Sequence, residues 1–257
     1  MTTPLFDLSG RTAVVTGGSR GIGLMAARGL LAAGATVIIS SRKSDACEQA
    51  VRELSDLGPV SAVPADLSTE AECRRLAEEV AARAGAVHIL VNNAGATWGA
   101  PFAEFPATAW DKVVDLNLKS PFFLTRALLP QLEAAATADD PARVVNVGSI
   151  DGLRVPGMPT YSYSASKAGL HHLTRVLAAE LGPRSITVNA IAPGPFESKM
   201  MAATLAEHGD EIAARSPLGR IGRPDDIAGV VVFLTSRAGS YITGAVIPVD
   251  GGIATTR

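Results

Sequence analysis

Short runs of β-branched and other apolar residues alternate with longer stretches of helical periodicity along almost the whole chain, and this rhythm restricts the fold. Most of the runs are apolar at consecutive positions, as expected of strands buried on both faces of a parallel sheet. The predicted strands are Thr12–Thr16, Thr36–Ser40, Val60–Val63, His88–Val91, Arg143–Val147, Thr187–Ile191 and Ala245–Val249.

The stretches between the strands are rich in Ala, Leu, Glu and Arg and are predicted to be crossover helices. They include Leu24–Ala33, Ala71–Ala84, Trp110–Ala135 and Ser164–Leu181. The pattern predicts an α/β fold, with a single doubly wound Rossmann-type domain over residues 1–257 and a mostly parallel sheet of about seven strands. Residues 136–141 are expected to form an exposed loop, and the polar connection at about 195–216 is expected to be a substrate lid.

The composition limits the classes of partner. A formal net charge of −2 gives no basic field that would attract nucleic acid or an acidic membrane surface, and no apolar run reaches transmembrane length. Cys47 and Cys73 lack CxxC or Cys/His neighbours, which argues against a metal site or a disulfide framework and favours a reducing compartment. We therefore expect a cytoplasmic protein without a signal peptide, a bound metal, or a nucleic-acid or membrane partner.

A glycine-rich turn follows the first predicted strand and opens a predicted helix. Glycines allow the backbone to turn tightly and to approach a pyrophosphate, while the helix N-terminus offers N–H donors. A glycine cluster can also serve only to connect a strand to a helix, but its place after the first strand favours phosphate binding. The candidate binding residues are Gly17, Ser19, Arg20, Gly21, Ile22 and Gly23.

The second predicted strand ends without a carboxylate, which bears on the choice of cofactor. An acidic residue there would bind the ribose hydroxyls of NAD(H) and repel a 2′-phosphate. Instead Ser41 and Arg42 follow the strand, and Arg20 lies in the glycine turn, so a phosphate dianion can be bound. The two arginines could also be solvated surface charges. The charge pattern predicts NADP(H) rather than NAD(H).

With Thr16 in front, the GxxxGxG spacing of Gly17, Gly21 and Gly23 resembles the glycine pattern of the short-chain dehydrogenase/reductase family. The resemblance implies roles for three further segments that follow predicted strands. An aspartate would bind the adenine amino group, an NNAG segment would brace the sheet beside the cofactor, and a Pro-Gly pair would contact the nicotinamide side. The matching residues are Asp66 and Leu67, Asn93, Ala94 and Gly95 after Asn92, and Pro193 and Gly194. For Asp66 a helix N-cap remains an alternative.

Tyr163 and Lys167 are four residues apart on a predicted helix, so their side chains share one face. A tyrosine with a pKa of about 10 is a poor acid–base group at neutral pH, and a nearby ammonium is expected to lower that pKa. Such a pair also arises by chance, with a packed tyrosine and a solvated lysine. Tyr161 is a weaker candidate because Ala165, not a cation, lies four residues after it.

Ser149 and Asn117 complete the candidate catalytic set. Ser149 follows the fifth predicted strand, so its hydroxyl should lie at the carboxyl edge of the sheet, within reach of a substrate carbonyl. The family resemblance implies that Asn117 bends its helix and holds a water that connects Lys167 to solvent. It also implies that Tyr163 and Lys167 contact the cofactor.

The resemblance therefore implies an NADP(H)-dependent carbonyl reductase that acts on a small-molecule ketone, and a homotetramer. Several segments, including residues 97–100 and 192–196, are similar to 3-oxoacyl reductases, one of them associated with rhamnolipid synthesis, which suggests a 3-oxoacyl thioester or related β-keto compound. The residues expected to line the substrate pocket are Trp98, Asp151 and Phe196, the last within the stretch 195–200. Asp151 is unusual beside an acyl chain and keeps sugar, steroid-like and xenobiotic ketones open. Two alternatives are an NAD-dependent alcohol or sugar dehydrogenase and a non-catalytic NADP(H)-binding sensor.

Overall fold

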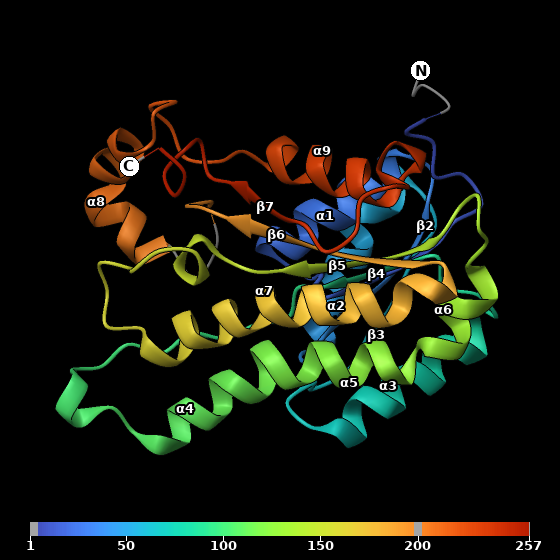
Figure 1. Ribbon diagram of the computed structural model, residues 1–257, viewed down its shortest axis with the longest axis horizontal. Coiled ribbons are helices and arrows are strands. Elements are labelled where there is room, and N and C mark those ends of the chain that lie inside the picture. Colours follow the sequence, from blue (N-terminus) through green and yellow to red (C-terminus); the bar gives the residue numbers. More distant parts are fainter. Residues whose placement is uncertain (1–4, 198–201, 257) are drawn as a thin grey trace.

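A parallel β-sheet lies between two layers of helices in the computed structural model, which describes residues 5–197 and 202–256 (Figure 1). The strands run in the order β3-β2-β1-β4-β5-β6-β7, and every neighbouring pair is parallel. Their bounds are β1 Thr12–Thr16, β2 Thr36–Ser41, β3 Val60–Pro64, β4 Ile89–Asn92, β5 Ala142–Val147, β6 Ile186–Pro193 and β7 Val246–Val249. The predicted doubly wound fold and all seven predicted strands are confirmed.

The helices divide between the two faces of the sheet. Helices α1, α2 and α9 pack on one face, and α3, α5, α6 and α7 pack on the other (Figure 1). The α-helices are α1 Gly21–Ala32, α2 Ser44–Leu54, α3 Glu70–Arg83, α4 Ala107–Val114, α5 Ser120–Ala127, α6 Leu129–Ala135, α7 Tyr161–Leu181, α8 Ala202–Arg215 and α9 Pro224–Thr235. Short 3₁₀ turns are η1 Ser55–Leu57, η2 Phe102–Glu104, η4 Ile150–Gly152, η5 Gly182–Arg184 and η6 Arg237–Gly239, and η3 Asp115–Lys119 is a π-helical segment.

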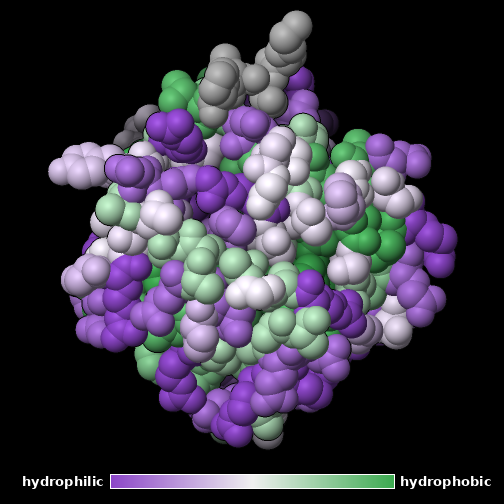
Figure 2. Space-filling model, turned by 90° about the vertical axis from the view of Figure 1, so that its right-hand side faces the viewer, coloured by the Kyte–Doolittle hydropathy of each residue, from purple (hydrophilic) through white to green (hydrophobic). Residues whose placement is uncertain are grey.

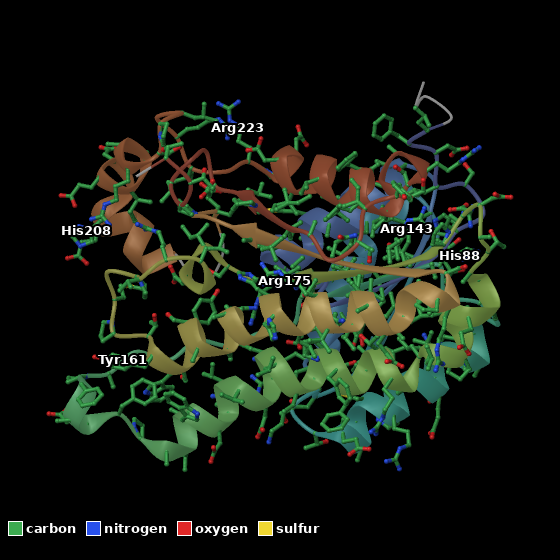
Figure 3. All side chains as sticks on the ribbon, in the orientation of Figure 1. His88, Arg143, Tyr161, Arg175, His208 and Arg223 are labelled. Atoms are coloured by element: carbon green, nitrogen blue, oxygen red, sulfur yellow. The ribbon has the colours of Figure 1, made fainter. Side chains whose placement is uncertain are left out.

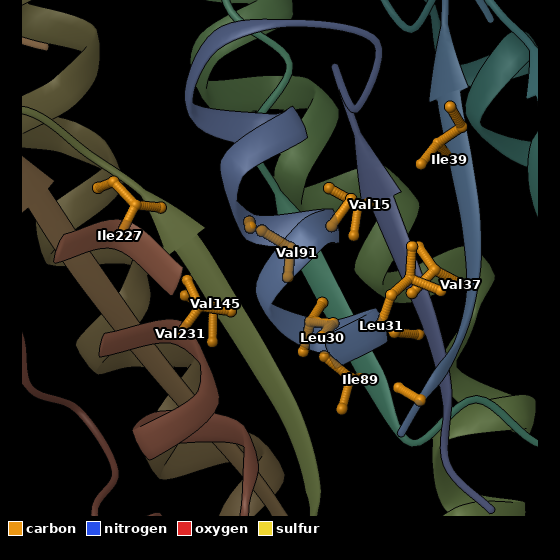
Figure 4. Packing of buried hydrophobic residues seen from close by; sticks show 14 of the residues in the cluster. Val15, Leu30, Leu31, Val37, Ile39, Ile89, Val91, Val145, Ile227 and Val231 are labelled. Atoms are coloured by element: carbon orange, nitrogen blue, oxygen red, sulfur yellow. The ribbon is translucent and has the colours of Figure 1, made fainter. Parts of the chain in front are cut away.

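Consecutive apolar residues along a strand pack alternately against the helices on the two faces of the sheet. Val14 and Leu90 join the cluster under α3, α5 and α7, whereas their neighbours Val15 and Val91 join the cluster under α1 and α9. Figure 4 shows this second cluster, in which the β-branched strand residues meet side chains of α1 and α9. A sheet covered on both faces explains why the strand sequences do not alternate.

One long predicted helix, over Trp110–Ala135, is interrupted in the structure. The chain forms α4, the π-helical segment η3, α5 and α6 in succession. Pro121 and Pro130 lie in the first turns of α5 and α6, where a missing N–H is tolerated. The sequence periodicity indicated helical structure correctly but did not resolve these breaks.

The region of the predicted lid, residues 195–216, contains α8. Residues 198–201, which belong both to this region and to the predicted pocket-lining stretch, lie outside the described residues. Among the described residues, no helix combines the length and the apolar character needed to cross a membrane.

Arg143 is a buried charged residue at the amino end of the sheet, and Figure 3 shows it at the end of the molecule away from Tyr161. Arg143, the second residue of β5, is only 1% exposed and donates to Asp140 Oδ1 at 3.0 Å and to the Ser236 carbonyl at 3.2 Å. Burial, together with the charge of Arg11, lowers the pKa of Arg143 to about 10. Figure 2 views this end of the molecule, where hydrophilic and hydrophobic side chains are interspersed.

Candidate active site

The carboxyl ends of the strands meet at one edge of the sheet, on the left in Figure 1. The strand order reverses between β1 and β4, because β2 and β3 continue in one direction from β1 and β5 to β7 in the other. Open α/β sheets bind ligands in the crevice at such a reversal. The predicted site residues on the loops after β1, β4, β5 and β6 all lie at this edge.

The glycine turn between β1 and α1 has a backbone that only glycine adopts easily. Gly17 and Gly21 have φ values of 63° and 53°. A Cβ atom at Gly17 would lie 2.5 Å from the Asn93 Nδ2 atom, and one at Gly23 would lie 2.4 Å from it. The first turn of α1 carries no acidic residue and has no side-chain cap, so its N–H groups suit an anionic group such as a pyrophosphate.

Thr16 and Asn93 connect the glycine turn to the loop after β4. The Thr16 hydroxyl accepts the backbone N–H groups of Asn93 and Ala94, at 2.9 and 3.0 Å. The Asn93 side chain donates to the carbonyls of Thr16 and Gly17, at 2.8 and 3.2 Å. Asn93 therefore supports the glycine turn from behind, whereas the resemblance implied only that the NNAG segment braces the sheet.

The glycine turn and the end of β2 both offer hydroxyl and guanidinium groups. Ser19 donates to the Ser41 hydroxyl at 2.9 Å. Arg20 is exposed, and the Arg42 side chain, 65% exposed, lies 3.8 Å from Asp66 as its ion-pair partner. Two exposed cations and two hydroxyls, Ser19 and Arg20 from the glycine turn and Ser41 and Arg42 from the end of β2, fit a 2′-phosphate, which an acidic residue after β2 would repel.

Asp66 is not the N-cap of the helix that follows it. That helix, α3, begins at Glu70, and the Thr69 hydroxyl caps it by accepting the N–H of Glu72 at 3.3 Å. The Asp66 carboxylate instead accepts the N–H of Ser68 at 3.3 Å and faces Arg42. The alternative left open by the sequence is wrong, and Asp66 stays available to a ligand. The Leu67 side chain is buried in the core, so only its backbone can contact one.

Tyr163, Lys167 and Ser149 come together at the carboxyl edge of β5. Lys167 Nζ lies 5.7 Å from the centroid of the Tyr163 ring and donates to the carbonyl of Val147 at 2.7 Å. Ser149 follows β5, its Oγ atom accepts the N–H of Asp151 at 3.1 Å, and its hydroxyl interacts with the Tyr163 side chain. The structure thus brings the three predicted residues together, although Tyr163 and Lys167 belong to α7 and Ser149 to the β5–α7 connection.

The protonation properties of this group differ from the sequence expectation. Burial raises the pKa of Tyr163 to about 12, opposed by the Ser149 hydroxyl and reinforced by Asp151. Burial lowers the pKa of Lys167 to about 8. The expected lowering of the Tyr163 pKa by Lys167 is not found, because removal of the phenol from water outweighs other influences. The ammonium is buried beside the ring with a backbone carbonyl as its hydrogen-bond acceptor.

Asn117 lies fully buried in the π-helical segment η3. Its Oδ1 atom accepts the N–H of Ala96 at 2.8 Å, and its Nδ2 atom donates to the Ala96 carbonyl at 2.9 Å and to Ser166 Oγ at 3.0 Å. A Cβ atom at Gly95 would lie 3.2 Å from Asn117 Oδ1 and 3.7 Å from Lys167 Nζ. Asn117 therefore fixes the loop after β4 against α7, close to Lys167.

The three residues expected to line the substrate pocket have different environments. Trp98 is 42% exposed, with Lys112 Nζ at 5.9 Å from its ring. Asp151 is partly buried, and burial raises its pKa. Phe196 is 3% exposed and belongs to the core cluster under α1 and α9, so the structure corrects its expected place in the pocket.

Phe196 is turned inward because the chain at Gly222 leaves room for its ring. A Cβ atom at Gly222 would lie 2.2 Å from two ring carbons of Phe196. The neighbouring Pro193 ends β6, and the N–H of Gly194 donates to the carbonyl of Val249 at 3.0 Å. The Pro-Gly pair therefore lies at the carboxyl edge of the sheet, while Phe196 anchors the segment after it.

Helix α7 carries two further side chains near the site, the phenol of Tyr161 and the imidazole of His171. Tyr161 packs edge-on against Phe102 and Phe105, with ring centroids 5.7 and 5.6 Å away, so it lies outside the catalytic group. His171 is buried one turn after Lys167 and faces the backbone of Ser149. Sequence reasoning missed His171, although its spacing of four from Lys167 could have indicated a shared helix face.

Comparison with known proteins shows similarity over nearly the whole chain. A family model described as Enoyl-(Acyl carrier protein) reductase matches residues 17–254. The Rhamnolipids biosynthesis 3-oxoacyl-[acyl-carrier-protein] reductase of Pseudomonas aeruginosa is 48% identical over 252 residues, 97% of this chain and 98% of the relative. The 3-oxoacyl-[acyl-carrier-protein] reductase FabG of Aquifex aeolicus is 37% identical over 248 residues, 96% of this chain and 98% of the relative.

Among solved structures, the Pseudomonas aeruginosa RhlG/NADP active-site complex has a TM-score of 0.96 to this chain at 47% sequence identity. The match covers 98% of this chain and 100% of that chain. The similarity thus includes the glycine turn, the strand-end loops and helix α7, which together form the candidate site.

Proposed function

Because the chain belongs to the short-chain dehydrogenase/reductase family, we propose that it reduces the ketone of a 3-oxoacyl thioester, or a related β-keto compound, to a secondary alcohol with NADPH. The observation that carries the proposal is the convergence of Ser149, Tyr163 and Lys167 at the sheet edge that also carries the glycine turn. Relatives with 48% and 37% identity named as 3-oxoacyl reductases support the substrate class.

The residues around the turn fit NADP(H). The uncapped first turn of α1 would hold the pyrophosphate, and Arg20, Arg42 and the hydroxyls of Ser19 and Ser41 would hold the 2′-phosphate. The relative solved as an NADP complex supports this choice over NAD(H). Bound there, the nicotinamide would supply the hydride, and the protein would supply binding, orientation and the proton.

Tyr163 would donate the proton to the carbonyl oxygen, and Ser149 would orient that oxygen by a hydrogen bond. A pKa of about 12 keeps the phenol protonated before reaction, which is the state that a general acid needs. Both hydroxyls would donate hydrogen bonds to the oxygen on which negative charge develops, which is the usual source of electrostatic stabilisation.

Lys167 would stabilise the phenolate that remains after proton transfer. Its ammonium is 5.7 Å from the ring centroid and is held in place by the Val147 carbonyl. Asn117 would support the route by which the proton is replaced, since it fixes the Ala96 backbone and Ser166 beside Lys167. Helix α7 would thus carry the general acid, Tyr163, and the loop after β4 would pack beside it through Asn117.

Trp98, Asp151 and the lid region at about 195–216 would surround the substrate. The exposed Trp98 ring suits an acyl chain. Asp151 is partly buried, and its negative charge raises the pKa of Tyr163. A substrate group that neutralises the Asp151 carboxylate would therefore make Tyr163 a stronger acid.

The assembly that we propose is a cytoplasmic homotetramer. Exposed apolar side chains on α5, on α7 and after α9 support burial against other copies: Phe122 is 37% exposed, Val176 50% and Tyr241 103%. The free, buried thiols of Cys47 and Cys73 are in keeping with a reducing compartment. Light scattering coupled to gel filtration measures the subunit number directly.

The central test is a steady-state panel that follows NADPH oxidation with acetoacetyl thioesters, a reactive diketone and keto-sugars, repeated with NADH. We expect the thioester to give the highest kcat/KM and NADPH to be preferred. Tyr163→Phe should keep its NADPH affinity but lose about 10²–10⁴-fold in kcat. Tyr161→Phe, on the same helix, is the matched control and should stay near wild type. Tight NADPH binding without turnover of any ketone would support a sensor instead.

A further inference from the structure

His171 is a buried imidazole directly beneath the loop that carries Ser149. It lies on α7 one turn after Lys167 and is 3% exposed. The backbone N–H of Ser149 points at its Nε2 atom, with a donor–acceptor distance of 3.4 Å. No step of the proposed mechanism uses this imidazole, although it contacts the residue that would orient the substrate oxygen.

The loop is shaped to fit around this ring. Ser149 stands between Gly148 and Gly152, and both glycines lie against the imidazole. A Cβ atom would lie 2.0 Å from His171 Nε2 at Gly148 and 2.9 Å from His171 Cε1 at Gly152. Contacts this short exclude a side chain at either position, so the backbone of the loop rests directly on the ring.

The imidazole must be neutral to make this contact. A protonated ring would carry a hydrogen on Nε2 and would face the Ser149 N–H donor with another donor. Burial and the positive charge of Lys167, with a smaller contribution from Arg175, lower the pKa of His171 to about 4, opposed by the backbone of Gly152. The acceptor therefore persists at neutral pH.

We propose that His171 is a positioning residue, whose Nε2 atom accepts the Ser149 N–H and thereby holds the Ser149 hydroxyl toward the oxygen that Tyr163 protonates. The proposal rests on the proposed function. It follows that His171 contributes to kcat through Ser149, because its ring contacts the loop after β5.

The test compares two variants of similar size, His171→Gln and His171→Met, in thioester reduction. Glutamine offers an amide oxygen near the place of Nε2, whereas methionine offers no comparable acceptor. We expect His171→Met to lose about 10- to 100-fold in kcat, the effect of a small misplacement, and His171→Gln to recover most of it. NADPH affinity should stay within about twofold in both. His172→Met, at the exposed neighbouring position, is the matched control.

A double variant separates positioning from general support of the fold. In a Ser149→Ala background the hydroxyl is gone, so adding His171→Met should cost little more activity, whereas a structural role would cost as much as in wild type. Equal kcat for the Gln and Met variants, or full additivity with Ser149→Ala, would overturn the proposal while thioester reduction by wild type stands. Failure of wild type to reduce any ketone of the panel would overturn the proposed function itself, and this inference with it.

Discussion

Replacing Thr16 by valine removes one hydroxyl and keeps the shape of the side chain. Thr16 is 1% exposed at the end of β1. Its hydroxyl accepts the backbone N–H groups of Asn93 and Ala94 and donates to the carbonyl of Val91, at 2.9, 3.0 and 3.3 Å. Valine fills the same space, so the change isolates the hydrogen bonds that connect the glycine turn to the loop after β4.

The expected cost follows from the groups left unpaired. Two N–H donors lose their acceptor, at about 1–3 kcal/mol each where water cannot replace it. Because Asn93 and Ala94 are only partly buried, we take the lower part of that range, about 2–3 kcal/mol in total. For a chain of this size about 1 kcal/mol moves Tm by about 2–4 °C, so Tm should fall by about 4–12 °C.

Thermal unfolding followed by circular dichroism measures this shift, with Thr16→Ser as the control that keeps the hydroxyl. The dissociation constant for NADPH, measured by fluorescence titration, should also rise for Thr16→Val, because Asn93 supports Gly17 and Gly23 from behind. If the valine variant unfolds within about 1 °C of the serine variant, the reasoning about this connection is refuted.

Three further predictions concern charges. Arg42→Asp should raise KM for NADPH by tenfold or more, which corresponds to a loss of about 1.4 kcal/mol in binding free energy. KM for NADH should stay nearly unchanged in parallel steady-state assays. Equal changes for both cofactors would contradict the 2′-phosphate site. Asp140→Asn leaves the buried guanidinium of Arg143 without its carboxylate and should cost about 3 kcal/mol in the free energy of unfolding measured with urea. Arg143→Met removes the charge itself and should cost distinctly less, and similar losses for the two variants would argue against an uncompensated charge. Because His171 has a pKa of about 4 in the folded chain against 6.5 for an unperturbed histidine, the imidazole is protonated at a higher pH in the unfolded chain than in the folded one. The contribution of neutral His171 to the free energy of unfolding is then fully present above pH 6.5. Up to about 3 kcal/mol of it is lost as pH falls toward 4. His171→Gln should lack this part of the acid destabilisation, and His172→Gln should keep it.

The fold could be predicted from the sequence because hydrophobic patterning determines it. Each run of consecutive apolar residues became a strand with both faces covered, and β1 has the predicted bounds, Thr12–Thr16. The breaks within Trp110–Ala135 escaped prediction since every fragment there keeps helical periodicity. The burial of Arg143 at the start of β5 also escaped, because its acceptor at Ser236 is far away in sequence and is brought there by the fold.

The candidate site was predictable where a side chain acts from a fixed place on the sheet or on α7. Ser149, Tyr163 and Lys167 converge as expected because strand ends and helix spacing determine their positions. Phe196 did not follow, since its direction depends on the space left at Gly222, which is far away in sequence. The pKa of Tyr163 also depends on burial, and residue spacing does not measure burial.

The π-helical segment η3 has a consequence for how this enzyme tolerates change. A π turn contains an extra residue relative to the α-helical ladder, and here it lies directly before α5, whose Leu124 packs on the sheet. Deleting one residue from Asp115–Lys119 would remove that extra residue and allow an uninterrupted α-helix, so the direction in which Leu124 faces would change little, whereas the turn that carries Asn117 would be lost. The extra residue therefore determines the position of the Asn117 amide, while the packing of α5 on the sheet would survive its removal.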